Sequence, residues 1–182
     1  MKSNGISKKV TTGVTFRLEE SLVDKLRKES EQKQTSLNTL ANQIFNEHID
    51  WHSNATKAGF IPVRKAFLIQ LIDRLAEKDI LAITEYLAKN ESKDFVLLLR
   101  DTYDIESALD VIETWMSISG FPHKHLVNDC VHSYIIQHEL GRKWSVYLSE
   151  MYRFLFEEFG LKKVHFDITD NTVSLTVDIK AH

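Results

Sequence analysis

Near the N-terminus, the hydrophobic positions first alternate and then recur at helical spacing. In an extended chain, Val14, Phe16 and Leu18 share one face, while Gly13, Thr15 and Arg17 share the other. Apolar residues spaced by three and four then predict two amphipathic helices, over 19–34 and from 36 to Trp51. A lone short strand cannot pair its own backbone groups, so the pattern predicts pairing with the same strand of a second copy.

The second predicted helix carries an apolar stripe suited to a dimer core. Its start is marked by Thr35 or Ser36, either of which can cap free helix amides. The stripe consists of Leu37, Leu40, Ala41, Ile44, Phe45 and Trp51. So small a module cannot build an adequate core alone, and homodimerisation is therefore expected.

This order of strand, helix, short turn and helix resembles the ribbon-helix-helix family of DNA-binding regulators, the MetJ/Arc/CopG type. Members pair two N-terminal strands into an antiparallel ribbon that enters the major groove of double-stranded DNA. The resemblance implies that Thr15 and Arg17 read base edges and that Gly13 allows close approach of the backbone. Ser36 and Asn38 match the start of the family's second helix, which anchors a phosphate. Helix capping alone would require the same residue types.

Positive charge is concentrated at the N-terminus. Residues 1–17 contain four basic side chains and no acidic one, so the net charge of −3 leaves −7 on the rest of the chain. Many family members carry charged residues in the middle of the second helix, where this chain has Asn42, Gln43 and Asn46. Electrostatic anchoring is therefore expected to rest on Lys8 and Lys9. The alternative is a solvated basic tail.

The rest of the chain predicts a second domain of mixed structure. Periodicity lapses over 52–60, which suggests a linker and a division into domains 1–55 and 56–182. Helices are predicted over 61–75, 79–90, 104–116 and 141–159, a strand over 125–138, and a hairpin over 163–179 with its turn at Asp170 and Asn171. Residues 95–99 fit either a strand or a buried helix. The fold class is α+β: a ribbon-helix-helix dimer module followed by several helices and a small antiparallel sheet.

Histidines give the second domain its only suggestive chemistry. His123, His125, Cys130, His132 and His138 lie within sixteen positions, and these are metal-ligand types. Their order is similar to that of nickel-responsive repressors of the ribbon-helix-helix superfamily, but the cysteine lies one residue too near. We expect hydrogen-bonded or partly exposed histidines and no metal site. The aromatic helix over 141–159 fits a core or subunit interface better than a ligand cavity.

Several function classes lack their motifs. There is no glycine-rich phosphate loop, nucleophile elbow or CxxC pair, so we expect no enzyme, catalytic residue or cofactor. The absence of a long apolar run or signal peptide, together with a single cysteine, predicts a cytoplasmic protein without a membrane partner.

The expected function is a dimeric, sequence-specific DNA-binding transcriptional regulator of the repressor kind. Its second domain would mediate oligomerisation or sense a partner, a small molecule or a metal. One alternative is an antitoxin whose second domain neutralises a toxin, although such segments are usually short and disordered until bound. Another is an interaction protein that does not bind DNA.

Overall fold

The computed structural model describes residues 11–180, in which the chain divides into two compact units. The first unit ends at Phe45 and the second begins at Asn46, whereas the lapse in periodicity suggested a boundary near residue 55. The difference arises because the first residues of the predicted linker over 52–60 are helical: a π-helical turn, η1 (His48–His52), leads into α3 (Ser53–Ala55).

The first unit contains the two helices that the sequence predicted. They are α1 (Glu20–Gln32) and α2 (Leu37–Glu47), whose last two residues lie past the boundary, and they are joined by a turn in which Gln34 has a φ of 52°. Residues 11–19 precede them and form neither helix nor strand in this single chain. A strand needs a partner backbone to complete its hydrogen bonds, so the predicted ribbon stays a prediction.

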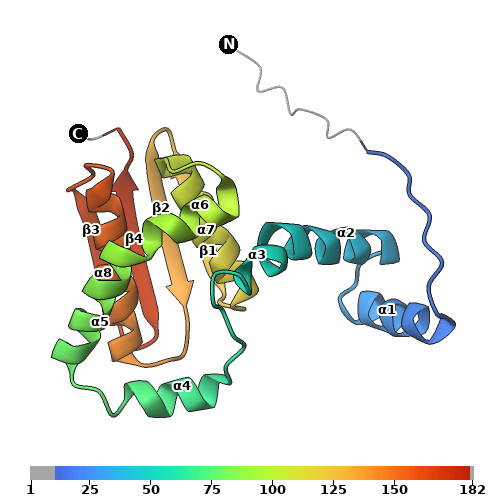
Figure 1. Ribbon diagram of the computed structural model, residues 1–182, viewed down its shortest axis with the longest axis horizontal. Helices are drawn as coiled ribbons and strands as arrows, with labels where there is room; N and C mark the ends of the chain where they lie inside the picture. The colour runs from blue at the N-terminus through green and yellow to red at the C-terminus, as the bar shows by residue number, and fades with distance from the viewer. Residues whose placement is uncertain (1–10, 181–182) are drawn as a thin grey trace. The chain divides into compact units, whose positions relative to one another are not determined.

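The second unit continues with four helices that precede its sheet in the chain and a fifth between the second and third strands (Figure 1). They are α4 (Lys65–Ile72), α5 (Glu77–Asn90), α6 (Ser92–Arg100), α7 (Ile105–Ile118) and α8 (Arg142–Glu158). The predicted start of α7 is confirmed, because the Asp104 carboxylate accepts from the Ser107 N–H at 2.8 Å. Helix α5 begins at Glu77, two residues before the predicted start, and Asp79 lies in its first turn, where its carboxylate accepts from the Ala76 N–H at 3.2 Å. The ambiguous segment 95–99 is helical, within α6.

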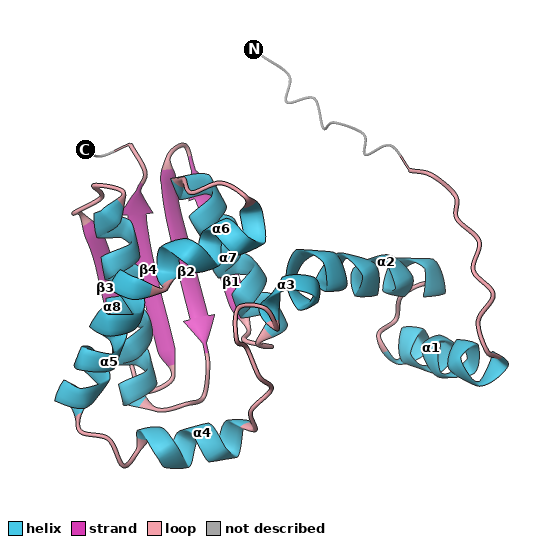
Figure 2. Cartoon of the chain, in the orientation of Figure 1, coloured by secondary structure: helices cyan, strands magenta, loops and turns pink. Residues whose placement is uncertain are grey.

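A four-stranded antiparallel sheet completes the second unit (Figure 2). Its strands are β1 (His123–Asn128), β2 (Val131–Gln137), β3 (Val164–Ile168) and β4 (Thr172–Asp178), in the order β1-β2-β4-β3. The prediction of one strand over 125–138 was wrong, because Asp129 and Cys130 form a turn and Asn128 pairs with Val131. Asp129 has a φ of 54°, a conformation that aspartate adopts more readily than most residues.

The C-terminal hairpin has the predicted register. Val164 pairs with Val177, Phe166 with Leu175, and Ile168 with Val173. The Thr169 N–H donates to the Thr172 carbonyl at 2.9 Å, which places Asp170 and Asn171 in the turn. Strict alternation of apolar side chains fixed this register, since a slip by one residue would expose the buried set.

One face of the sheet forms the main core with α7 and α8. Tyr134, Ile136, Val173, Leu175 and Val177 are fully buried there against Met116 of α7 and Leu148 and Phe156 of α8. Figure 2 shows helices gathered on this side of the sheet. The mixed α+β class is confirmed.

A second, smaller core corrects the prediction for Trp51. The sequence placed this side chain in the dimer stripe of the first module, but it is 5% exposed in the second unit. Trp51 packs with Ala55, Val96, Leu99 and Val111, and its ring centroid lies 5.2 Å from that of Phe60. Burial of Trp51 and Ala55 in this core stabilises the helical conformation of residues 48–55.

None of the helices within residues 11–180 is long and apolar enough to cross a membrane.

Candidate nucleic-acid interface

The extended segment before α1 exposes an alternating apolar set. Val14, Phe16 and Leu18 are 70%, 58% and 51% exposed. Thr15 and Arg17, at the intervening positions, are also exposed. If this segment pairs as a strand, side chains alternate along it, and the apolar set and the polar set then face opposite ways. The apolar face would then be suited to burial and the polar face to contact with a polar partner.

The helices of the first unit leave further apolar side chains uncovered. Leu22, Ile44 and Phe45 are exposed, and Leu40 alone is buried among the apolar residues described before Asn46. The Phe16 ring lies 5.4 Å from that of Phe45, so the extended segment and α2 contribute to one apolar surface. A single buried apolar side chain gives this unit a very small core, and completion of that core by a second copy stays a prediction.

The start of α2 is capped by Ser36. Its hydroxyl oxygen accepts from the Thr39 N–H at 3.0 Å and lies 2.8 Å from the Thr39 hydroxyl oxygen. The predicted capping is confirmed, whereas the predicted phosphate contact stays a prediction. Asn38 is exposed in the first turn, and its side chain has no hydrogen bond to another described residue. The helix amides and the Asn38 amide can therefore still meet an anion.

Variants at these two positions separate capping from phosphate binding. Ser36→Ala is expected to lower the free energy of unfolding by about 1 kcal/mol, because the capping acceptor is lost. Asn38→Ala is expected to leave the free energy of unfolding unchanged and to weaken binding to DNA of any sequence. Urea unfolding at fixed protein concentration and gel-shift titration would measure the two effects. Equal DNA affinity of Asn38→Ala and the wild type would remove Asn38 from the interface.

Three of the other predicted contact residues are not tested by the geometry. Lys8 and Lys9 lie outside the described residues. A Cβ added at Gly13 would meet no atom within 4 Å, so nothing in the single chain requires glycine there. Its predicted role, close approach of the backbone to DNA, concerns the bound state.

The second unit brings only two of the clustered histidines together. His125 Nε2 lies 2.9 Å from His132 Nδ1, and His125 Nδ1 lies 3.1 Å from Glu113 Oε2 on α7. The His125 ring also stacks on Tyr134 with centroids 4.0 Å apart. Burial first, and the neighbouring His125 second, lower the pKa of His132, which favours a neutral ring. The sequence could not indicate the role of Glu113, because a separate helix supplies it.

The remaining residues of the predicted histidine group lie apart. Cys130 is in the β1–β2 turn, and His123 Nδ1 lies 2.8 Å from the Phe121 carbonyl oxygen. Within residues 11–180, no three histidine, cysteine or acidic side chains are grouped so that they could hold a metal ion.

His138 is fully buried and joins three segments of the second unit. The Ser145 hydroxyl on α8 donates to the Thr169 carbonyl at 2.7 Å, so His138 Nε2, 2.8 Å away, must donate to that hydroxyl. His138 Nδ1 accepts from the Leu140 N–H at 3.0 Å. Burial first, and the positive charge of Lys65 second, lower the pKa of His138 to about 4. Both ring nitrogens of the neutral His138 are thus engaged in hydrogen bonds that link parts of the second unit, and neither is free to bind a metal ion.

No protein-family model matches the chain, and no curated protein matches it either. The features of the first unit that indicate a function are therefore the exposed apolar and polar residues before α1, the capped start of α2 and the charges near them.

Proposed function

We propose that this protein is a sequence-specific DNA-binding transcriptional regulator that contacts DNA as a dimer through its first unit. The observation that carries the proposal is the exposed alternating segment ahead of two helices. Val14, Phe16 and Leu18 are exposed at alternate positions, with the exposed residues Thr15 and Arg17 between them.

Pairing of two such segments would bury the apolar side chains and leave the polar ones exposed. An antiparallel ribbon supplies the missing backbone hydrogen bonds and turns the apolar side chains of both copies toward their helices. Thr15 and Arg17 then point outward in two copies. A two-stranded ribbon fits the major groove, where arginine can donate two hydrogen bonds to guanine O6 and N7 and threonine can contact a base edge.

The α2 helices would hold the ribbon in the groove. In a two-fold dimer, two capped helix starts with exposed Asn38 side chains can each face a phosphate. Such contacts fix register without reading sequence, and each one makes affinity more dependent on salt. A two-fold protein prefers a palindromic or repeated site.

The proposal is tested first by selecting duplexes from a random DNA pool with the full chain. We expect a preferred, symmetric sequence. Arg17→Ala should then lower affinity for the selected duplex at least about tenfold and leave affinity for a shuffled duplex nearly unchanged, because a bidentate base contact contributes about 1–3 kcal/mol. Gel-shift titrations at one salt concentration provide the comparison.

Arg27→Ala is the matched control. Arg27 is an exposed arginine of α1 in the same unit, paired with Asp24 at 3.3 Å, and its loss should affect the two duplexes equally. An unchanged sequence preference in Arg17→Ala would contradict the assignment of the ribbon. No DNA binding at low salt would favour an interaction protein, and co-purification of a small toxin would favour an antitoxin.

A further inference from the structure

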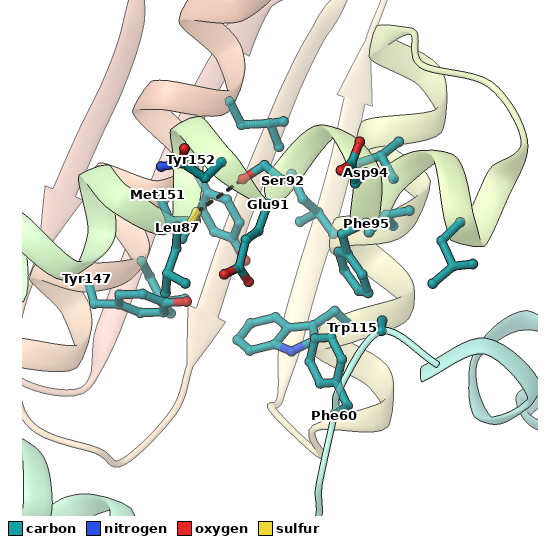
Figure 3. A pocket seen from close by; sticks show the side chains of 18 of the residues that line it. Phe60, Leu87, Glu91, Ser92, Asp94, Phe95, Trp115, Tyr147, Met151 and Tyr152 are labelled. Atoms are coloured by element: carbon teal, nitrogen blue, oxygen red, sulfur yellow. Dashed lines mark hydrogen bonds between the residues drawn. The ribbon is translucent and has the colours of Figure 1, made fainter. Parts of the chain in front are cut away.

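The second unit contains a cavity of about 590 Å³ that the DNA-binding proposal does not use (Figure 3). It lies between the loop at 57–60 and helices α5, α6, α7 and α8. Cavities of this size bind small organic molecules in many proteins.

Aromatic rings form much of the cavity wall. The rings are those of Phe60, Phe95, Trp115, Trp144, Tyr147 and Tyr152. Phe60 and Phe95 have centroids 5.0 Å apart, and Trp144 and Tyr147 have centroids 4.7 Å apart. The faces of such rings are electron-rich, so they attract a cation while they bury apolar surface.

The charges that line the cavity favour a positively charged ligand. Lys57, Glu91 and Asp94 are the charged residues of the wall, and Lys57 Nζ donates to Asn54 Oδ1 at 3.2 Å. The side chains of Glu91 and Asp94 have no hydrogen bond or ion pair with any residue that the structure describes. Two carboxylates against one lysine leave a net negative charge.

Glu91 lies beside two aromatic residues of the cavity wall. Figure 3 shows its carboxylate between Tyr147 on one side and Trp115 on the other. Burial first, and the negative charge of Glu91 second, raise the pKa of Tyr147 to about 12. The Glu91 carboxylate is therefore close enough to attract a positive charge bound at the aromatic wall.

The same wall contains unpaired polar atoms. Within the described residues, the Tyr152 hydroxyl and the Trp144 indole N–H are buried without a hydrogen-bond partner. A buried donor left unpaired costs about 1–3 kcal/mol, which is unusual for a completed core. This wall is better explained as one side of a binding site.

We propose that this cavity binds a lipophilic organic cation, a molecule with aromatic rings and one delocalised positive charge. The rings of the ligand would pack among the aromatic side chains, and its charge would lie near Glu91 and Asp94. An organic anion of the same shape would be repelled by both carboxylates. The site does not depend on DNA binding, and its test uses no DNA, so the two proposals can fail separately.

The experiment compares two ions of matched shape and opposite charge, tetraphenylphosphonium and tetraphenylborate. Each is titrated into the full chain by isothermal titration calorimetry, with tryptophan fluorescence as a second signal, since Trp115 and Trp144 line the cavity. We expect one phosphonium ion bound per chain, with quenching, and binding of the borate at least about tenfold weaker. Equal or tighter binding of the borate, or binding of neither ion, would overturn the proposal.

Glu91→Gln removes the charge and keeps the shape, and should weaken phosphonium binding about tenfold while weakening borate binding less or improving it. Glu157→Gln makes the same charge change at an exposed position of α8 outside the cavity, and it should bind as the wild type does. Ala58→Trp places a large side chain in the loop that borders the cavity and should reduce binding of the phosphonium. Identical affinities of Glu91→Gln and the wild type would contradict the role of Glu91.

Discussion

Replacing Phe16 with aspartate is expected to dissociate the first units of two copies and to abolish DNA binding. Phe16 is 58% exposed in the single chain, and the proposed ribbon buries it in both copies. Losing a buried phenylalanine costs about 3 kcal/mol or more per copy, so association should weaken on the order of ten-thousandfold. Sedimentation of the full chain should show one association step fewer than in the wild type.

The neighbouring substitution Thr15→Asp is the control for Phe16→Asp. It introduces the same charge one position away, where alternation places the side chain on the outward face. We expect Thr15→Asp to sediment as the wild type does and to lose DNA binding, because a carboxylate would then face the phosphates and base edges. If both variants dissociate, or neither does, the two faces of the segment are assigned wrongly.

The second large effect concerns His138 and pH. Its pKa is about 4 in the folded protein against an ordinary value of 6.5, so the unfolded chain binds a proton between these values while the folded protein does not. The contribution of His138 to the free energy of unfolding should therefore be complete above pH 6.5 and should fall as the pH drops toward 4. The loss from this group is on the order of 3 kcal/mol.

His138→Gln should make this decline shallower, since glutamine does not titrate. Its absolute stability will also differ, so the comparison is between slopes measured by urea unfolding at several pH values. His165→Gln, at an exposed position of β3, should keep the wild-type slope. A slope in His138→Gln as steep as in the wild type would show that other groups cause the acid sensitivity.

Local patterns predicted the elements whose partners are near in sequence. The β3–β4 hairpin followed from strict alternation on both sides of Asp170 and Asn171, and α1 and α2 followed from their apolar spacing. The prediction of a single strand over 125–138 was wrong because β-branched and aromatic residues lie on both sides of Asp129. The pattern therefore gave no sign of the turn between the two strands.

Long-range packing decided what local patterns could not. Residues 95–99 are helical, and Val96 and Leu99 bury their side chains beside Trp51, a residue more than forty positions earlier in the chain. The same applies to the sites. The choice of Thr15 and Arg17 rests on alternation within six residues and stays a prediction, whereas Glu113 reaches His125 of β1 from helix α7 and the cavity is lined by four helices and a loop.

The early boundary at Phe45 has a practical consequence for fragments of this protein. A fragment that begins at residue 56 would lack Trp51 and Ala55, two side chains of the second unit's smaller core. The rings of Phe60 and Phe95, each in contact with Trp51, would be left exposed and prone to aggregation. A fragment that begins at or before Asn46 keeps these contacts and is the one to express.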